Sequence, residues 1–270
     1  MVSRDAAFVG SIPENYDRYL GPIFFWHYAD DLVARLPVTS GMRVLETACG
    51  TGIVTERLVR RLAGQGTVVA TDLNEPMIAR GQRRLPGTPH LEWRQADATN
   101  LPFKDASFDA VVCQFGLMFF PDKAAGIRGA FRVLKLGGRY LLNVWDALEH
   151  NPVARITHET IATFFPSDPP QFYTVPFSLH DKAQVCAWLE AAGFEDIESH
   201  TVRGVGTSPS AAEATIGLVE GNPVYGAIMD RRPAALAEIK AAVVANLAAQ
   251  LGDHPLRCDL RAHVFSARRP

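Results

Sequence analysis

An apolar run that breaks into a glycine-containing turn most strongly constrains the fold of this chain. Residues 44–47 read as a strand, residues 48–52 contain the turn Cys-Gly-Thr-Gly, and apolar residues then recur at helical spacing over residues 53–62. A strand that meets a helix across such a turn lets the backbone approach a ligand closely, because glycine carries no Cβ. The next apolar run ends in Asp72, about 20 residues further on, where a nucleotide-binding βαβ unit places its ribose-binding acid.

Strand and helix patterns alternate through the first half of the chain. Residues 14–36 carry apolar and aromatic residues at helical spacing, which predicts one or two helices ending before Pro37. The alternation that follows predicts a parallel sheet covered by helices on both faces. We expect strands over residues 43–47, 68–71, 91–95, 110–114 and 140–144, and helices over residues 54–62, 76–84 and 123–134.

The pattern changes after Trp145. Residues 147–180 are rich in prolines and aromatic residues, which favours an irregular covering segment and makes this stretch a candidate lid. Asp181 is expected to cap a helix that Gly193 ends. The remaining expected elements are a strand over residues 196–202, a helix over residues 233–251 and a final strand over residues 260–267.

The glycine turn distinguishes two families that share this architecture. A dinucleotide fingerprint would need a third glycine where the chain has Thr55. Glu46 at the strand end, Cys49 before the first glycine and the missing third glycine instead resemble motif I of the class I S-adenosylmethionine-dependent methyltransferases. The resemblance continues in order and spacing and covers about residues 41–146, with matching segments at residues 71–78, 95–103, 108–114 and 132–141.

The closest resemblance is to the group that includes the ubiquinone and menaquinone C-methyltransferases and many small-molecule enzymes. It implies an α/β, Rossmann-like, doubly wound and mostly parallel seven-stranded sheet, with an antiparallel edge strand and a helical cap. Four regions follow: an N-terminal helical cap (1–40), a core that binds S-adenosylmethionine (41–146), a lid insertion (147–180) and a C-terminal completion of sheet and helices (181–270).

The resemblance also implies which residues bind the cofactor. Asp72 would accept hydrogen bonds from the ribose hydroxyls, although a helix-capping aspartate is the alternative. Asp97 and Ala98 would meet the adenine, unless Asp97 is only a turn former. Leu73 and Met77 would pack against the adenine faces, with ordinary core packing as the alternative. Gln114 would line the methyl-transfer pocket and contact the cofactor, with a solvated strand end as the alternative. The full expected set is Glu46, Ala48, Cys49, Gly50, Gly52, Asp72, Leu73, Met77, Asp97, Ala98 and Gln114.

No catalytic residue can be assigned from the sequence. A sulfonium already activates its methyl group, so alignment and exclusion of water are expected to matter more than one chemical group. The weak candidates are Tyr19, His27 and Phe115, each of which is also explained by packing or surface exposure. Tyr16 is an equal alternative to Tyr19 as a cover for the cofactor. The aromatic cluster around Phe115, with Met118, Phe119 and Phe120, either floors a substrate cavity or packs in the core.

Composition narrows the function further. The net charge of −2 predicts no nucleic-acid surface, and four widely spaced cysteines suggest neither a zinc site nor a disulfide framework. No apolar run is expected to reach the roughly 18 residues of a membrane helix, and residues 1–5 do not read as a signal peptide, which favours the cytoplasm. No metal is expected, and a homodimer is left open.

The leading hypothesis is an S-adenosylmethionine-dependent methyltransferase that acts on a small, partly apolar acceptor through carbon, oxygen or nitrogen. The alternative is a non-catalytic protein that binds S-adenosylmethionine or S-adenosylhomocysteine, because the motifs predict binding and not an acceptor. A nicotinamide oxidoreductase is a third reading, disfavoured by Thr55 and by the later strand motifs.

Overall fold

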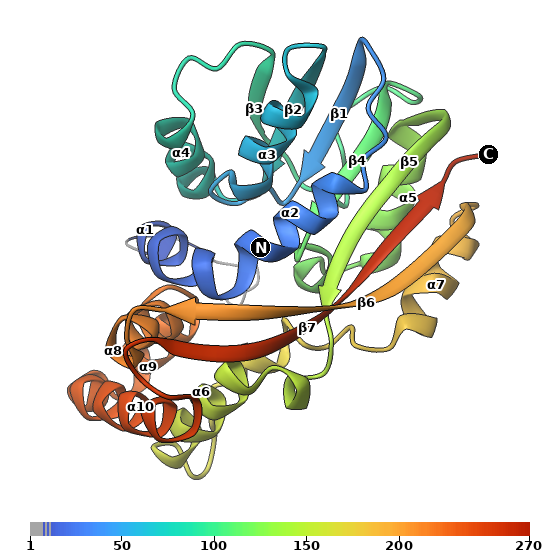
Figure 1. The fold of residues 1–270 in the computed structure, drawn as a ribbon. Helices are drawn as coiled ribbons and strands as arrows, with labels where there is room; N and C mark the ends of the chain where they lie inside the picture. Colours follow the sequence, from blue (N-terminus) through green and yellow to red (C-terminus); the bar gives the residue numbers. More distant parts are fainter. Residues whose placement is uncertain (1–7, 9, 11) are drawn as a thin grey trace.

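A seven-stranded sheet organises the protein in the computed structural model, which describes residues 8, 10 and 12–270 (Figure 1). Residues 1–5, on which the signal-peptide expectation rests, lie outside the described residues. The strands lie in the order β3, β2, β1, β4, β5, β7, β6. Their bounds are β1 (Met42–Thr47), β2 (Gly66–Asp72), β3 (Leu91–Gln95), β4 (Phe108–Gln114), β5 (Leu134–Trp145), β6 (Glu195–Ser208) and β7 (Leu256–Arg268).

The first five strands are parallel, so their carboxyl ends meet at one edge of the sheet. At this edge Thr47 of β1 pairs with Thr71 of β2, and Asp72 of β2 pairs with Gln95 of β3. On the other side of β1, strand β4 ends at Gln114. Ligands of open α/β sheets bind beyond these strand ends, where the strand order reverses, and here the order reverses between β1 and β4.

The far end of the sheet contains the expected antiparallel strand. β7 runs antiparallel to both β5 and β6, and it begins at Leu256, four residues before the expected strand start at Leu260. β6 covers the outer side of β7, so the reversed strand is second from the end of the sheet. The predicted mostly parallel, seven-stranded Rossmann-like fold is confirmed.

Helices cover both faces of the sheet, with α3 in front of it and α5 behind it in Figure 1. α3 buries Leu58 and Leu62 on one face and carries Arg60 and Arg61 in its last turn, where cations suit the helix dipole. The helices are α1 (Ile12–Asn15), α2 (Trp26–Ala34), α3 (Ile53–Leu62), α4 (Glu75–Arg84), α5 (Lys123–Val133), α6 (Pro152–Thr163), α7 (Lys182–Ala191), α8 (Ala211–Thr215), α9 (Val224–Arg231) and α10 (Leu236–Leu251). Two segments are π-helices, η2 (Tyr16–Phe25) and η6 (Ile216–Glu220). Four short segments are 3₁₀-helices: η3 (Leu117–Phe119), η4 (Leu148–His150), η5 (Phe172–Thr174) and η7 (Pro233–Ala235).

The N-terminal segment forms one helical stretch that lies against both the core and the C-terminal strands. It consists of α1, η2 and α2, with Pro22 inside η2. Two glycines of β6 and η6 allow the close approach: a methyl group on Gly206 would lie 2.5 Å from the Ile23 carbonyl oxygen, and one on Gly217 would lie 2.7 Å from Leu20 Cδ2. Residues almost 200 positions apart in the chain therefore pack closely, Gly206 against the backbone of Ile23 and Gly217 against the side chain of Leu20.

Residues 147–180 are more regular than the sequence indicated. The 12-residue helix α6 occupies the first half of this stretch, and only the part after Thr163 is irregular, with the short turn η5. The prolines that suggested irregularity explain the difference: Pro152 stands at the first position of α6, where a missing N–H costs nothing, and Pro166, Pro169 and Pro170 follow its end.

The C-terminal region combines the last two strands with a group of helices, and Figure 1 shows α6, α8, α9 and α10 gathered at one end of β6 and β7. Asp181 caps α7 as predicted, its side chain accepting a hydrogen bond from Ala183 N. The helix Pro233–Leu251, with a mean hydropathy of 1.4, is long and apolar enough to cross a membrane, which corrects the expectation that no segment reaches this length. Its alanines raise the hydropathy although Glu238 and Lys240 interrupt the run, and its Val243 face is buried against the protein. One such helix is weak evidence for a membrane span.

Candidate functional site

The strand ends β1, β2, β3 and β4 open onto a cavity of about 490 Å³. This volume falls within the range of about 300–1,000 Å³ that small-molecule and cofactor sites occupy. Eight of the eleven predicted cofactor residues line it together: Ala48, Gly50, Asp72, Leu73, Met77, Asp97, Ala98 and Gln114. Glu46 and Cys49 line a smaller adjoining cavity with Gly50 and Gln114.

The glycine turn is shaped by positive backbone angles. Ala48 has a φ of 53° and Gly50 a φ of 55°, and Gly50 N donates a 2.9 Å hydrogen bond to Asp72 Oδ2. A methyl group on Gly50 would meet only Met77 Cε at 3.5 Å, so the exposed side of this residue faces the cavity. The loop therefore presents bare backbone to the cavity, and its contact with a cofactor stays a prediction.

Gly52 has a packing role in the structure, and its contact with the cofactor stays a prediction. Neither cavity includes it; its φ is 82°, and a methyl group there would lie 2.8 Å from Trp93 Cη2. The glycine at this position allows α3 to start above the indole ring. Cys49 is buried, and burial raises the pKa of its thiol well above 9.0, so the thiol stays protonated and packs under the turn.

Asp72 anchors the site from the end of β2. Its Oδ2 accepts from Gly50 N, and its Oδ1 accepts from Asn74 N at 2.8 Å and from Asn74 Nδ2 at 3.3 Å. Burial raises the pKa of the carboxyl, and the hydrogen bonds from Asn74 and Gly50 oppose that rise. The side chain lines the large cavity while it organises both the glycine turn and the start of α4.

Glu46 lies one strand away and is the most strongly perturbed acid of the site. It is 2% exposed, and its Oε2 accepts a 2.6 Å hydrogen bond from Thr55 Oγ1. Burial, with a smaller contribution from the Asp72 charge, raises the pKa of Glu46 to about 8 against the hydrogen bond from Thr55. Thr55 is the residue that replaced the third glycine of a dinucleotide fingerprint, and the structure gives it this partner.

The opposite side of the large cavity is lined by the segments after β2 and β3. Met77 is buried on α4, whereas Leu73 is 37% exposed at the rim. Asp97 accepts from Thr99 N at 2.8 Å and from Thr99 Oγ1 at 2.7 Å, so it forms the turn that the alternative reading proposed and also lines the cavity. The two readings of Asp97 are compatible.

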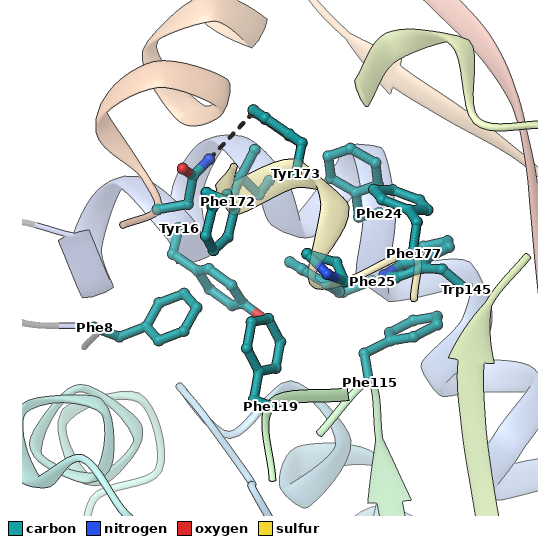
Figure 2. A pocket seen from close by; sticks show the side chains of 13 residues that line it. Phe8, Tyr16, Phe24, Phe25, Phe115, Phe119, Trp145, Phe172, Tyr173 and Phe177 are labelled. Atoms are coloured by element: carbon teal, nitrogen blue, oxygen red, sulfur yellow. Dashed lines mark hydrogen bonds between the residues drawn. The ribbon is translucent and has the colours of Figure 1, made fainter. Parts of the chain in front are cut away.

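A second, narrower chamber of about 70 Å³ adjoins the large cavity and is walled almost entirely by aromatic rings (Figure 2). Phe115, at the end of β4, stacks on Trp145, at the end of β5, with ring centroids 3.8 Å apart and an interplanar angle of 3°. Figure 2 shows the rings converging from the N-terminal helices, the strand ends and residues 172–177. The lining residues are Phe8, Tyr16, Leu20, Phe24, Phe25, Phe115, Phe119, Trp145, Phe172, Tyr173, Pro176, Phe177 and Asn222.

The polar groups of this chamber are largely occupied by one another. Tyr173 Oη donates to the Leu218 carbonyl at 2.6 Å and accepts from Asn222 Nδ2 at 3.3 Å. Burial raises the pKa of Tyr173 and of Tyr16, so both phenols stay neutral. Tyr16 also lines the large cavity and the small cavity beside Glu46, which places its ring where all three meet.

Two of the weak catalytic candidates are not brought to these cavities. The Arg18 Cζ atom lies 5.1 Å from the centroid of the Tyr19 ring, and the Tyr19 Cβ lies against Gly217. Both tyrosines belong to the π-helix η2, in which a step of three residues turns the Tyr19 side chain away from that of Tyr16. His27 is exposed, with Nε2 3.2 Å from the Arg203 carbonyl oxygen. All eight histidines are among the described residues, and none lines the three cavities.

Sequence reasoning missed several lining residues. Lys123 lines the large cavity, donates to the Phe120 carbonyl at 2.9 Å, and has its pKa lowered by burial. Asn222 and Tyr173 are separated by about 50 residues and carried no local motif, whereas the aromatic density around Phe172 was the available signal for the chamber. Within residues 8, 10 and 12–270, no group of three or more His, Cys, Asp or Glu side chains is placed to hold a metal ion.

Comparison with known proteins agrees with this arrangement. A family model described as "Methyltransferase domain" matches residues 44–138. The ubiquinone/menaquinone biosynthesis C-methyltransferase UbiE of Idiomarina loihiensis is 32% identical over 183 residues, which cover 62% of this chain and 72% of that protein. The chain belongs to the class I S-adenosylmethionine-dependent methyltransferases. The demethylmenaquinone methyltransferase of Clavibacter sepedonicus is 34% identical over 170 residues, covering 59% of this chain and 68% of that protein.

Solved structures share the fold of this methyltransferase. The phosphoethanolamine N-methyltransferase 2 of Haemonchus contortus, in complex with S-adenosyl-L-methionine, superposes with a TM-score of 0.65 at 18% identity, covering 100% of this chain and 60% of that one. The YcgJ protein of Bacillus subtilis gives a TM-score of 0.58 at 19% identity, covering 90% and 99%. The chain is therefore an enzyme that uses S-adenosylmethionine to methylate a small molecule, and the non-catalytic and nicotinamide readings are set aside.

Proposed function

We propose that S-adenosylmethionine occupies the 490 Å³ cavity with its adenosine against Asp72, Met77 and Asp97 and its methionine end toward Glu46 and Gly50. The fit rests on the chemistry of the lining: a carboxylate at the end of β2 can accept from vicinal hydroxyls, and the glycine turn leaves backbone accessible. When bound, the cofactor supplies an electrophilic methyl group on a sulfonium. The chain supplies the alignment, the exclusion of water and the contacts to the acceptor.

The acceptor belongs at the junction between the two cavities. Phe8, Tyr16, Phe115 and Phe119 line both the large cavity and the aromatic chamber, so a molecule in the chamber faces the large cavity across these rings. Rings and alkyl groups suit such walls, whereas an unpaired charge would lose its hydration. We therefore propose a partly apolar acceptor that carries a flat or aromatic group. The named relatives act in quinone biosynthesis, and this chemistry agrees with such an acceptor.

The size of the chamber implies that the cap moves. A volume of about 70 Å³ is far smaller than the roughly 300 Å³ of the smallest usual ligand pockets, so an acceptor enters only if the walls separate or if it extends into the larger cavity. The movable walls are Phe24 and Phe25 of η2 and residues 172–177. We propose that the N-terminal helices and residues 147–180 form a lid, and that its closure excludes water during transfer.

No side chain in the chamber is placed as a strong base, so activation of the acceptor falls on alignment and on the acceptor's own nucleophilicity. Lys123 lines the large cavity, burial lowers its pKa, and its ammonium group is placed to meet an anionic group of the acceptor. We propose that the enzyme is cytoplasmic.

The observation that carries the cofactor placement is the convergence of the glycine turn and Asp72 on one cavity, and calorimetry tests it. An Asp72→Asn variant keeps one carbonyl oxygen but removes the charge, and it should bind S-adenosylhomocysteine about 1–3 kcal/mol more weakly than the unaltered protein. Asp109→Asn, at the opposite end of the sheet, is the control and should bind normally. Equal affinity in a folded Asp72→Asn protein would overturn the placement.

The acceptor class is tested by mass spectrometry. The purified protein is incubated with a metabolite extract and with S-adenosylmethionine that carries an isotopically labelled methyl group. We expect the label in a product with an aromatic or quinone-like ring. A labelled product that is small and highly charged would contradict the proposed chemistry of the chamber.

A further inference from the structure

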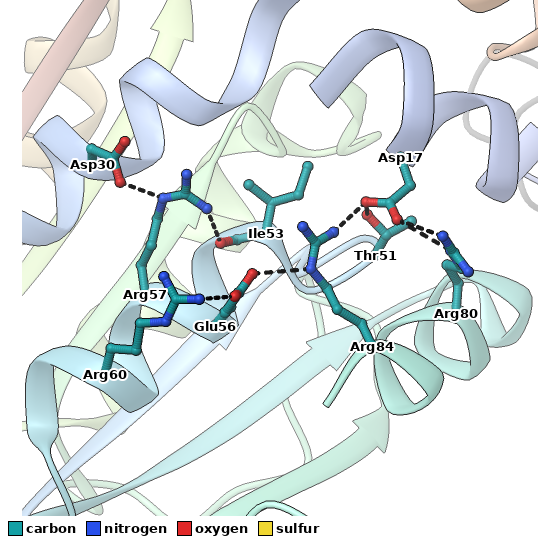
Figure 3. Close-up of polar contacts among 9 residues, drawn as sticks. All are labelled: Asp17, Asp30, Thr51, Ile53, Glu56, Arg57, Arg60, Arg80 and Arg84. Atoms are coloured by element: carbon teal, nitrogen blue, oxygen red, sulfur yellow. Dashed lines mark hydrogen bonds and ion pairs between the residues drawn. The ribbon is translucent and has the colours of Figure 1, made fainter. Parts of the chain in front are cut away.

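A buried ion-pair cluster ties the N-terminal cap to the cofactor loop (Figure 3). Asp17, the second residue of η2, is 8% exposed. Its Oδ1 accepts from Thr51 Oγ1 at 3.1 Å and from Arg84 Nη1, and its Oδ2 accepts from Arg80 Nε at 3.2 Å and Arg80 Nη2 at 2.9 Å. One carboxylate thus joins three segments that are distant in the sequence.

Asp17 and two of its three partners, Thr51 and Arg80, lie close in sequence to residues that line the large cavity. Asp17 itself follows Tyr16, Thr51 follows Gly50 in the glycine turn, and Arg80 lies one turn after Met77 on α4. The cluster therefore fixes the cap, the glycine turn and α4 relative to one another from behind the cavity wall. No atom of Asp17 itself is part of that wall.

Because Asp17 faces two arginines, we expect a neutral side chain at this position to weaken the link between the N-terminal cap and α4. Arg80 and Arg84 have side chains that are only 29% and 22% exposed, and Asp17 faces both. Arg84 has a second partner in Glu56 Oε2 at 3.1 Å, whereas Asp17 is the ion-pair partner of Arg80. Removing the charge of Asp17 leaves the Arg80 guanidinium without its carboxylate partner, and this partly exposed side chain gains more hydration when η2 moves away from α4.

We propose that Asp17 is a positioning residue that holds the N-terminal cap closed over the bound cofactor and couples cap closure to the shape of the glycine turn. With the cluster intact, the Tyr16 ring stays at the junction of the cavities and the cap slows the escape of the ligand. Without it, η2 separates from α4 more often, and the Thr51 hydroxyl loses the bond that links the turn to the cap. The inference rests on the proposed placement of the cofactor.

The chain offers a matched control for this proposal. Asp30 of α2 forms an ion pair with Arg57 of α3, with Oδ1 2.5 Å from Nε, so it also ties an N-terminal helix to the core. The Asp30 side chain is 67% exposed, and neither residue lines any of the three cavities. Figure 3 shows the Asp30 pair and the Asp17 cluster on either side of α3.

The experiment compares Asp17→Asn, Arg80→Gln and Asp30→Asn with the unaltered protein, using S-adenosylhomocysteine as the probe. Stopped-flow displacement measures its dissociation rate, and hydrogen exchange with mass spectrometry measures the protection of residues 12–25 with and without it. We expect Asp17→Asn to dissociate the probe at least about tenfold faster, equivalent to about 1.4 kcal/mol, and to lose the probe-dependent protection of residues 12–25. Arg80→Gln should shift both readouts in the same direction, and Asp30→Asn neither.

The outcomes distinguish a failure of the role proposed for Asp17 from a failure of the cofactor placement on which that role rests. Normal dissociation and normal protection in Asp17→Asn would overturn it while leaving the cofactor placement intact, because that placement is tested by Asp72→Asn. A purely structural role would appear as faster exchange throughout the protein with an unchanged probe-dependent part, and this too would overturn the proposal. If Asp17→Asn does not fold, Arg80→Gln, which keeps the Asp17 pair with Arg84, decides by the same two readouts.

Discussion

The buried acid Glu46 should make the stability of the ligand-free protein fall as the pH rises. Its pKa lies near 8 in the folded protein, against an ordinary value of 4.5, because the carboxyl is removed from water beside Asp72. A carboxyl whose pKa is raised by folding binds a proton more tightly in the folded state. Its contribution is therefore fully present below about pH 4.5 and is lost as the pH rises from there toward 8.

The size of the effect follows from the same values. Each pKa unit corresponds to about 1.4 kcal/mol, so a rise from 4.5 to about 8 amounts to a loss of about 5 kcal/mol between pH 4 and pH 9. We expect relaxation of the site to reduce this, so a loss of about 2–5 kcal/mol is the expected range. Glu46→Gln cannot ionise, and its side-chain oxygen still accepts from Thr55.

Urea unfolding of the unaltered protein and of Glu46→Gln, at half-unit steps from pH 4.5 to pH 9, measures the difference directly. As the pH rises, the free energy of unfolding of the unaltered protein should fall relative to that of Glu46→Gln, because only the unaltered protein must bury a charge. The pH-independent cost of the amide cancels when only the slope is compared. Two stability profiles that stay parallel across this range would refute the reasoning and show that Glu46 is ionised with a compensating partner.

Three further predictions concern the pocket, the turn and the ligand. Phe115→Ala should lower kcat/KM more than His27→Ala or Tyr19→Ala once an acceptor is known, because only Phe115 reaches the cavities; steady-state kinetics beside a folding control decide, and loss of turnover in His27→Ala alone would favour a histidine base. Gly52→Ala should lower the free energy of unfolding by about 1–3 kcal/mol, through both its positive φ and the tryptophan ring beneath it, and more than Gly137→Ala, which has a positive φ and open space; equal losses in denaturant titrations would discount the ring contact. S-adenosylhomocysteine at 100 times its Kd should raise the free energy of unfolding by about 2.7 kcal/mol, and an unchanged denaturation midpoint would contradict a binding site in the native state.

The core of the fold was predictable because its information is local. The strand that contains Glu46, the glycine turn and the acid at Asp72 are closely spaced signals of a βαβ unit, and the structure places Asp72 and Gly50 within hydrogen-bonding distance. Helix caps were equally local, as Asp181 shows. Each of these signals depends on residues only a few positions apart, so a single sequence contains them.

The acceptor side could not be predicted because its contacts join distant segments. Phe115 and Trp145 stack although 30 positions separate them, and Asn222 reaches Tyr173 across about 50. Aromatic content identified the segments but not which rings would face one another. The π-helical geometry of η2 places Tyr16, and not Tyr19, at the cavities, and no periodicity in the sequence indicated a π-helix.

The packing of Leu20 and Ile23 of the N-terminal cap against Gly217 and Gly206 has a consequence for the order in which the protein assembles. During synthesis the first helices leave the ribosome long before β6 and η6 exist, so their apolar side chains must wait for the last quarter of the chain. A nascent chain that has already formed β1 to β5 therefore still exposes one wall of its pocket. Truncation before residue 204 should remove the surface that packs against the Leu20 side chain and the Ile23 backbone, and should yield a protein that aggregates instead of one that merely lacks a helix.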